Sequence, residues 1–279
     1  MATRLKLGLP NYGNTCYINS VLQCLRYSKP LVYMLRDHRV NNNKNDKKDQ
    51  LLESFVELLY ADADPRDLHI FIRNLAHLQQ QFRLLRQCDA HELYLYIVDT
   101  FFEKFENLKN PFKGMLKSTV TCNVCGNNSV SKHPFISLSL EMDQNAQEQC
   151  VSQMLQRYQT YEELQDKIDC DKCKVRQFSQ KILHVVDNPT LLVLHLKRFN
   201  GMQKNNASIK IEKKIEVNND QYKLIALCNH SGTMNGGHYT ASCRRRDELW
   251  IVCNDNNISN IQDLPNSTSV PYILFYQTI

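Results

Sequence analysis

The chain has 279 residues, of which 42% are hydrophobic, and its formal net charge is +5 at neutral pH. This length can form one large domain or two small ones around a sizeable core. The mild charge requires neither a nucleic-acid nor a membrane partner, and we expect neither. There is no run of eighteen apolar residues, and residues 1–10 lack the apolar core of a signal peptide, so we expect a soluble protein that is not secreted.

The eleven cysteines are a guide to the cellular compartment. Their number is odd, the chain is long, and four of them form two C-x-x-C pairs. Disulfide frameworks usually have an even number of cysteines in a short secreted chain. We therefore expect reduced thiols and metal ligands, in an intracellular protein of the cytoplasm, the nucleus or both.

The first predicted helix begins at Cys16, directly after the turn-rich residues 8–15. Ile18, Val21 and Leu25 recur at helical spacing and predict one buried face. A thiol in the first turn of a helix lies near unpaired N–H groups that favour the thiolate, the form that attacks a carbonyl carbon. Cys16 is therefore a candidate nucleophile. The local pattern fits a buried structural cysteine equally well.

Further helices are predicted before the pattern changes to strands. An apolar stripe covers 51–59, and residues 68–85 are again helical in character. The polar run 41–49 is predicted to be a surface loop. The next helix begins after Asp89, which forms a capping-box-like start with Glu92 three positions later.

The two C-x-x-C pairs lie beyond residue 110, where short strands begin. They consist of Cys122, Cys125, Cys170 and Cys173. Two such pairs can form a tetrahedral four-thiolate zinc site, although the gap between them is longer than a zinc ribbon requires. Redox-active cysteines are the alternative, but a redox motif needs only one pair. Because four protein thiolates leave no open position for substrate, such a metal would be structural.

Strands are predicted for most of the remaining chain. They cover 117–122, 182–186, 191–196, 209–217, 222–228 and 272–276, with a helical segment around 151–158. Residues 191–196 are apolar enough to be buried on both faces of a sheet. Residues 200–206 are predicted to be a loop.

Two strand-like runs near the C-terminus flank the polar residues 244–248, which predicts a hairpin. If the loop is centred on Arg246, opposed residues have numbers that sum to 492, and His238 faces Asn254. Such side chains stand about 5 Å apart at Cβ, so the Asn254 amide could orient the imidazole. Asp255 points to the other face unless the register slips by one residue, and it is the second choice. An ordinary hairpin with a polar end is the alternative.

Cys16, His238 and Asn254 have the residue types and chain order of a papain-like Cys/His/Asn arrangement. Residues 11–19 resemble the cysteine box of ubiquitin-specific proteases, and residues 229–241 resemble their histidine box. Weaker boxes also match: 87–92 resemble the Q-x-D-A-x-E box, 196–199 the lysine-arginine-phenylalanine box, and 272–276 the closing strand. The chain departs from the family at Cys88, where glutamine is common, and at 93–94, where Phe-Leu is common.

This resemblance implies an α+β fold of the papain-like cysteine protease superfamily, with the thumb, fingers and palm of ubiquitin-specific proteases. Residues 1–279 would be one catalytic domain. The mainly helical thumb would cover about 1–110, the zinc-binding fingers about 111–186 and the mainly β palm about 187–279. The family's zinc lies at the tip of the fingers, so the resemblance implies one structural zinc on the four paired cysteines and no organic cofactor.

The resemblance assigns roles to two more residues, and the small size of two glycines suggests a third role. Asn11 matches the family's oxyanion asparagine, and Asp89 matches the aspartate that grips arginines near the ubiquitin C-terminus. Gly236 and Gly237 would let a diglycine tail pass close to the backbone. Asn11 as a turn residue and Asp89 as a helix cap also have purely structural interpretations.

Together these features predict a thiol-dependent deubiquitinase that hydrolyses the isopeptide bond after the C-terminal diglycine of ubiquitin. Its partners would be ubiquitin or ubiquitinated proteins, and we expect a monomer. A protease for another ubiquitin-like modifier is one alternative. An inactive ubiquitin-binding scaffold is another, which the intact Cys16, His238 and Asn254 disfavour. A zinc-containing nucleic-acid module is disfavoured because the basic residues are scattered and the aromatic residues follow apolar stripes.

Overall fold

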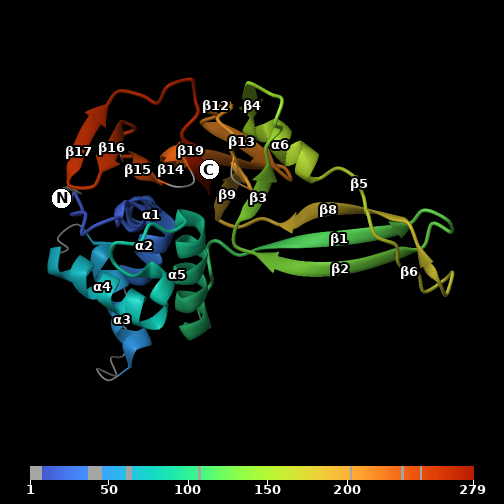
Figure 1. Ribbon diagram of the computed structural model, residues 1–279, viewed down its shortest axis with the longest axis horizontal. Helices are drawn as coiled ribbons and strands as arrows, with labels where there is room; N and C mark the ends of the chain where they lie inside the picture. Colours follow the sequence, from blue (N-terminus) through green and yellow to red (C-terminus); the bar gives the residue numbers. More distant parts are fainter. Residues whose placement is uncertain are drawn as a thin grey trace.

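The computed structural model has a helical layer, a large twisted sheet above it and a group of long strands that project to one side (Figure 1). It describes residues 8–36, 46–60, 65–105, 108–201, 203–233, 236–245 and 247–279. Among these residues, no helix is long and apolar enough to cross a membrane. Residues 41–45 of the predicted surface loop, Asn235 and the predicted hairpin centre Arg246 lie outside the described residues.

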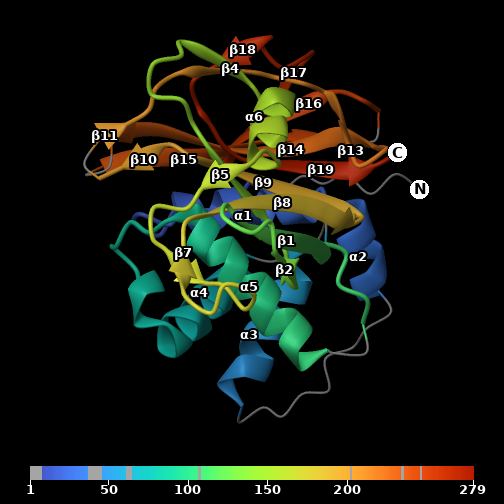
Figure 2. The same cartoon turned by 90° about the vertical axis from the view of Figure 1, so that its right-hand side faces the viewer.

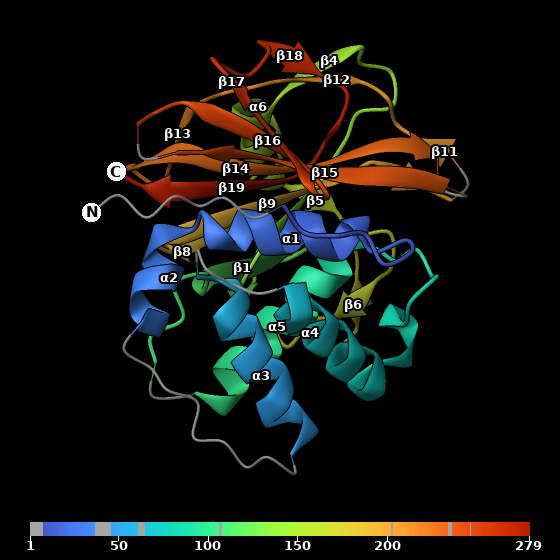
Figure 3. The same ribbon diagram turned by 90° about the vertical axis from the view of Figure 1, so that its left-hand side faces the viewer.

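The helical layer comes from the N-terminal part of the chain. It contains α1 (Cys16–Arg26), α2 (Lys29–Arg36), α3 (Lys47–Leu58), α4 (Pro65–Leu78), the 3-10 helix η1 (Gln80–Phe82) and α5 (Ala90–Lys104). Local signals fix two of the starts. Asp46 Oδ1 accepts a hydrogen bond from Lys48 N at the start of α3, and Pro65 opens α4, where its missing N–H costs nothing. All of α1 is buried, between the large sheet and the other helices (Figure 3).

The large sheet has eight strands. They are β3 (Leu138–Glu141), β9 (Leu191–Lys197), β13 (Lys214–Val217), β14 (Asp220–Thr233), β15 (Gly236–Arg244), β16 (Trp250–Asn254), β17 (Asn257–Ile261) and β19 (Pro271–Thr278). Seven follow the order β17-β16-β15-β14-β19-β9-β3, and β13 pairs with β14. One face covers α1 and the opposite face covers α6 (Val151–Tyr158), as Figure 2 shows. Because both faces are covered, residues 191–194 of β9 are buried, which confirms the prediction for this strand.

The projecting strands form a second, antiparallel sheet. Its order is β2 (Asn128–Phe135), β1 (Gly114–Cys122), β8 (Ser179–Asp187) and β5 (Glu162–Glu163). At the far end, β6 (Ile168–Asp169) pairs with β7 (Arg176–Gln177). Every residue of β2 except Phe135 is exposed, so this part of the molecule contains little hydrophobic core. The tip therefore needs another source of stability.

Some predictions of secondary structure are wrong, and residues 47–49 of the expected surface loop belong to α3. The expected strand 209–217 consists of β12 (Ser208–Lys210) and β13, which lie in different sheets. β12 pairs with β4 (Glu148–Cys150) and β18 (Ser267–Thr268). The alternation of apolar and polar residues over 209–217 predicted a single strand because Ile209 and Ile215 are both buried, although each lies in a different sheet. The expected loop 200–206 contains the short hairpin of β10 (Phe199–Asn200) and β11 (Gln203–Lys204).

The range 111–186 does not form one spatial unit. It contains the projecting strands, but β3 within it joins the large sheet in parallel with β9. The helix α6 from the same range packs on that sheet as well. The chain therefore leaves the projecting strands, contributes to the large sheet and returns.

Candidate active site and metal centre

Asn11 organises the turn that precedes Cys16. Its Oδ1 accepts hydrogen bonds from Gly13 N at 3.0 Å, Thr15 N at 3.1 Å and Thr15 Oγ1 at 3.2 Å. Gly13 has a φ of 92°, which glycine adopts without steric cost. These bonds fix the chain so that α1 begins at Cys16, whose side chain is buried against the sheet.

His238 and Asn254 meet at the end of the β15–β16 hairpin. His238 Nε2 and Asn254 Oδ1 are 2.7 Å apart, a hydrogen bond in which the ring N–H donates. The predicted register is nevertheless wrong. Ala241 pairs with Cys253 and Arg244 with Trp250, so paired numbers sum to 494 rather than 492. A shift of two keeps both side chains on one face, and Asn254 reaches His238 as a diagonal neighbour.

Cys16 lies against the strand that carries His238. The backbone N–H of Tyr239, the next residue along β15, donates to its thiol. The pKa of Cys16 is raised, because burial of the thiol outweighs this hydrogen bond and the Asp255 carboxylate adds to the rise. The backbone N–H groups of Cys16 and Tyr17 at the helix start do lower the pKa of the thiol, as the sequence predicts, but burial outweighs them in the free protein. A neighbouring base must take the proton, and the imidazole of His238 is on the adjacent residue.

Asp255 bonds to the cysteine loop rather than to the imidazole. Its Oδ2 accepts from Asn11 Nδ2 at 2.9 Å, and its Oδ1 accepts from Asn19 Nδ2 at 2.8 Å. Its backbone O also accepts from Leu9 N at 2.9 Å. Asp255 has a φ of 51°, a left-handed conformation that aspartate tolerates better than most residues. The second-choice orienting residue thus ties the hairpin end to the loop before Cys16.

Asp89 caps α5, as its position predicts. Its Oδ1 accepts from His91 N at 2.6 Å and from Glu92 N at 3.0 Å. Its Oδ2 accepts from the hydroxyl of Tyr272 on β19. Both oxygens of the half-buried carboxylate already have partners, so any contact with an arginine would use their remaining lone pairs.

The two glycines before His238 differ in their surroundings. A Cβ added to Gly236 would meet nothing within 4 Å. A Cβ added to Gly237 would lie 2.2 Å from His230 Nε2, so this position is small for packing reasons. Gln87 also holds Gly237: its Nε2 donates to Gly237 O at 2.5 Å, and its Oε1 accepts from Gly237 N.

The four paired cysteines converge at the tip of the projecting strands. Their sulfur atoms all lie within 4.8 Å of one another. Cys122 Sγ and Cys173 Sγ are 4.0 Å apart, and Cys125 Sγ and Cys170 Sγ are 3.5 Å apart. A tetrahedral zinc with bonds of about 2.3 Å requires sulfurs about 3.8 Å apart, so the residues fit this ion.

The backbone around the cysteines forms two equivalent knuckles. Gly126 N donates to Cys122 O at 2.9 Å, and Lys174 N donates to Cys170 O at 2.8 Å. Gly126 and Lys174 both adopt a positive φ, 66° and 60°. Backbone N–H groups in the first knuckle lower the pKa of Cys122, which favours the thiolate that a metal requires.

Sequence reasoning assigned no separate role to Asn19 or Gln87. Asn19 Nδ2 donates to Leu9 O, Pro10 O and Asp255 Oδ1, and its side chain is buried in a helix whose neighbours are largely apolar. Asn19 could have been noticed in the sequence, because it is a polar residue at a position of the helix that the apolar periodicity predicts to be buried. Gln87 gave no such signal, because its partner Gly237 is 150 positions away.

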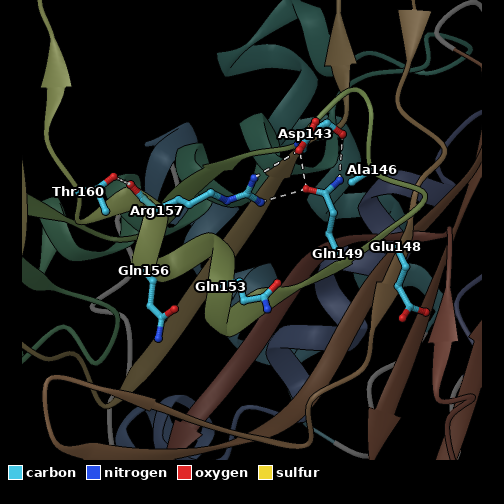
Figure 4. A pocket seen from close by; sticks show the side chains of 8 residues that line it. All are labelled: Asp143, Ala146, Glu148, Gln149, Gln153, Gln156, Arg157 and Thr160. Atoms are coloured by element: carbon cyan, nitrogen blue, oxygen red, sulfur yellow. Dashed lines mark hydrogen bonds and ion pairs between the residues drawn. The ribbon is translucent and has the colours of Figure 1, made fainter.

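A surface hollow of about 440 Å³ lies beside α6 and contains none of the predicted site residues (Figure 4). Its polar lining includes Arg157, whose Nη2 donates to Gln149 Oε1 at 3.2 Å and whose Nη1 is 3.9 Å from Asp143 Oδ2. The hollow therefore does not extend the site around Cys16.

The fold places a cysteine at the start of a buried helix beside a hairpin that carries histidine and asparagine, which defines a papain-like cysteine protease. The helical layer is its thumb, the large sheet its palm and the projecting strands its fingers. Residues 7–276 match the family described as "Ubiquitin carboxyl-terminal hydrolase". The chain belongs to the ubiquitin carboxyl-terminal hydrolase family.

Curated relatives cover nearly the whole chain. Ubiquitin carboxyl-terminal hydrolase 25 of Arabidopsis thaliana is 30% identical over 97% of this chain and 47% of its own length. Ubiquitin carboxyl-terminal hydrolase Usp2 of Drosophila melanogaster is 29% identical over 97% of this chain and 34% of its own length. Ubiquitin carboxyl-terminal hydrolase 4 of A. thaliana is 26% identical over 98% of this chain and 93% of its own length. The chain therefore spans a third to a half of some relatives and nearly all of another.

Solved structures agree on the fold. The Ubp8/Sgf11/Sus1/Sgf73 DUB module of SAGA bound to ubiquitin aldehyde contains a chain that superposes with a TM-score of 0.84 at 24% identity. The match covers 100% of this chain and 71% of that one. A chain of the yeast SAGA DUB module with a point mutant of Sgf73 superposes with a TM-score of 0.84 at 26% identity. This match covers 100% of this chain and 70% of that one.

Proposed function

We propose that this chain is a thiol-dependent deubiquitinase that hydrolyses the isopeptide bond after the C-terminal diglycine of ubiquitin. The observation that carries the proposal is the His238–Asn254 hydrogen bond on the strand that packs against Cys16. Family membership and the naming of the relatives as ubiquitin carboxyl-terminal hydrolases support ubiquitin as the substrate.

His238 acts as the general base for Cys16. Because Asn254 Oδ1 accepts the Nε2–H, the neutral ring keeps its lone pair on Nδ1. That nitrogen takes the proton of the Cys16 thiol, whose pKa burial would otherwise keep too high for attack. The thiolate then attacks the carbonyl carbon of the terminal glycine.

Asn11 and the start of α1 stabilise the oxyanion that forms. Asn11 Nδ2 has two hydrogens, and Asp255 takes one of them. The second hydrogen and the backbone N–H of Cys16 are the proposed oxyanion donors. The imidazolium of His238 protonates the leaving lysine amine, and water then hydrolyses the thioester with His238 again as base.

The four-cysteine cluster is proposed to hold one structural zinc. Cys122, Cys125, Cys170 and Cys173 would all be ligands, which supplies a cross-link at a tip with little hydrophobic core. The chemistry at Cys16 uses none of these thiols.

Cys16→Ala tests the proposed function. We expect it to abolish cleavage of a fluorogenic ubiquitin C-terminal substrate and labelling by a ubiquitin-vinyl probe, while ubiquitin binding remains. Cys150→Ala, which removes a half-buried thiol before α6, is the matched control and keeps full activity. Unchanged turnover in Cys16→Ala would refute the assignment. Labelling of the wild type by a probe for another modifier, and not by the ubiquitin probe, would replace the proposed substrate.

A further inference from the structure

Lys204 donates hydrogen bonds to the end of β14, beyond the point where β14 stops pairing with β19. β14 pairs with β19 as far as Asn229, opposite Pro271. Among the described residues, the last backbone–backbone hydrogen bond on this edge is from His230 N to Val270 O at 2.8 Å. The N–H and C=O groups of a strand residue point to the same side, so the carbonyls of His230 and Gly232 lie on this uncovered edge. Lys204 Nζ donates to both, at 2.8 Å and 3.2 Å.

The opposite edge of this segment of β14 pairs with β15, the strand that contains the proposed base His238. Ser231 pairs with His238, and Gly232 pairs with Gly237. The Lys204 ammonium is therefore separated from the His238 strand by one strand only. A displacement of β14 at this point would move His238 relative to Cys16, which is on a different element.

Lys204 is itself held in place by the hairpin β10–β11. The hairpin base is anchored by Arg198, which is fully buried and donates through Nη1 to Asn205 O at 2.9 Å and through Nε to Pro271 O at 2.5 Å. Phe199 adds a ring 6.0 Å from the Lys204 ammonium. The ammonium thus has a fixed position from which to bind β14.

We propose that Lys204 is a positioning residue that aligns His238 with Cys16 by holding the end of β14. The inference rests on the proposed function only in taking His238 as the base for Cys16.

The charge on Lys204 is costly in this environment. Burial, and then repulsion from Arg198, lower the pKa of Lys204 to about 8. Within the described part of the chain, the Lys204 ammonium contacts two carbonyl oxygens and an aromatic ring, with no carboxylate among these partners. An apolar side chain would fill the space without this desolvation cost. What an apolar side chain could not do is donate hydrogen bonds to the carbonyl groups of β14 and so hold the end of this strand.

The test is the rate at which iodoacetamide alkylates Cys16, followed by mass spectrometry of the peptide that contains it. This rate reports how well His238 withdraws the thiol proton and requires no ubiquitin. We expect Lys204→Met to lower it, together with kcat on a fluorogenic ubiquitin substrate, by about 10- to 100-fold with little change in KM. Lys204→Arg, which keeps charge and donors, should stay within about threefold of the wild type.

Lys213→Met is the matched control, because it removes an exposed lysine paired with Asp263 and should leave both rates unchanged. If Lys204→Met does not fold, Lys204→Leu is measured instead and is expected to lose rate in the same direction. Wild-type alkylation and kcat in the folded Met or Leu variant would overturn the proposal, as would equal losses in Lys213→Met. A wild type that cleaves no ubiquitin substrate would overturn the proposed function, while the alkylation comparison would still decide the role of Lys204.

Discussion

Asp255 accepts a hydrogen bond from Asn11 Nδ2 at 2.9 Å, although the two residues are 244 positions apart. The Asn11 amide is thereby held at both ends, because its Oδ1 also binds the turn before Cys16. Because both ends of the amide are held, the second Nδ2 hydrogen has a fixed direction before substrate binds. This arrangement gives Asp255 a role separate from that of Asn254.

Asn11→Ala and Asp255→Ala are expected to lower kcat by similar factors, about 100-fold each, since each removes the aimed amide donor. The double variant should be little worse than either single one, because Asp255 acts through Asn11. Steady-state kinetics on a fluorogenic ubiquitin substrate provides the test. Losses that multiply in the double variant would show that the two residues act independently.

Asn254→Ala should lower kcat by about 100-fold for a different reason, the loss of ring orientation at His238. Asn254→Asp keeps an acceptor for Nε2–H and should recover most of the activity. Because Asn254 and Asp255 hold different groups, their effects should multiply in a double variant. Equal activity of Asn254→Ala and wild type would remove Asn254 from the proposed triad.

The glycine pair can be separated by alanine substitution. Gly237→Ala should destabilise the protein by about 1–3 kcal/mol, because its Cβ would collide with His230 and with Ser231 O. Gly236→Ala has open space and should keep wild-type stability in urea unfolding. If a diglycine tail passes over this strand, Gly236→Ala should nevertheless raise KM. An unchanged KM would place the tail elsewhere.

Metal removal should affect stability before chemistry. Cys125→Ser is expected to lose the bound zinc, measured as metal per chain, and to lower Tm. Cys150→Ser should keep both. Alkylation of Cys16 should remain near the wild-type rate in both variants, because the fingertip cysteines are not part of the site around Cys16. Purified wild type without zinc but with an unchanged Tm would contradict the structural role.

Stability should fall as the pH falls below about 6.5, because His91 and His195 are stacked and neutral. Their ring centroids are 3.9 Å apart. Burial lowers the pKa of His91 to about 4, and burial together with His91 lowers that of His195 to about 3. The unfolded chain therefore binds protons that the folded chain does not, and stability is lost progressively between about pH 6.5 and 3.

His195→Gln isolates this contribution. Urea unfolding between about pH 7.5 and 5.5 should show a smaller pH dependence in the variant than in the wild type. The variant also controls for other groups that titrate in this range, since they are the same in both proteins. Identical slopes would mean that the stacked pair is not the source.

The sequence by itself determined the residue types of the site and most of the elements that carry them. Cys16 at the start of a helix, Asp89 as a helix cap and β9 as a doubly buried strand follow from periodicity and capping, which are local properties. The strand predicted over 209–217 failed because periodicity reports burial and not which sheet a strand joins.

Only the tertiary structure decided how the site is held together. The His238–Asn254 contact was anticipated with the wrong register, since the loop centre cannot be read from residue types alone. The bonds from Asp255 to Asn11 and from Lys204 to β14 join distant parts of the chain. Such contacts, and the burial that raises the pKa of Cys16, depend on which surfaces pack together, and no local pattern encodes that.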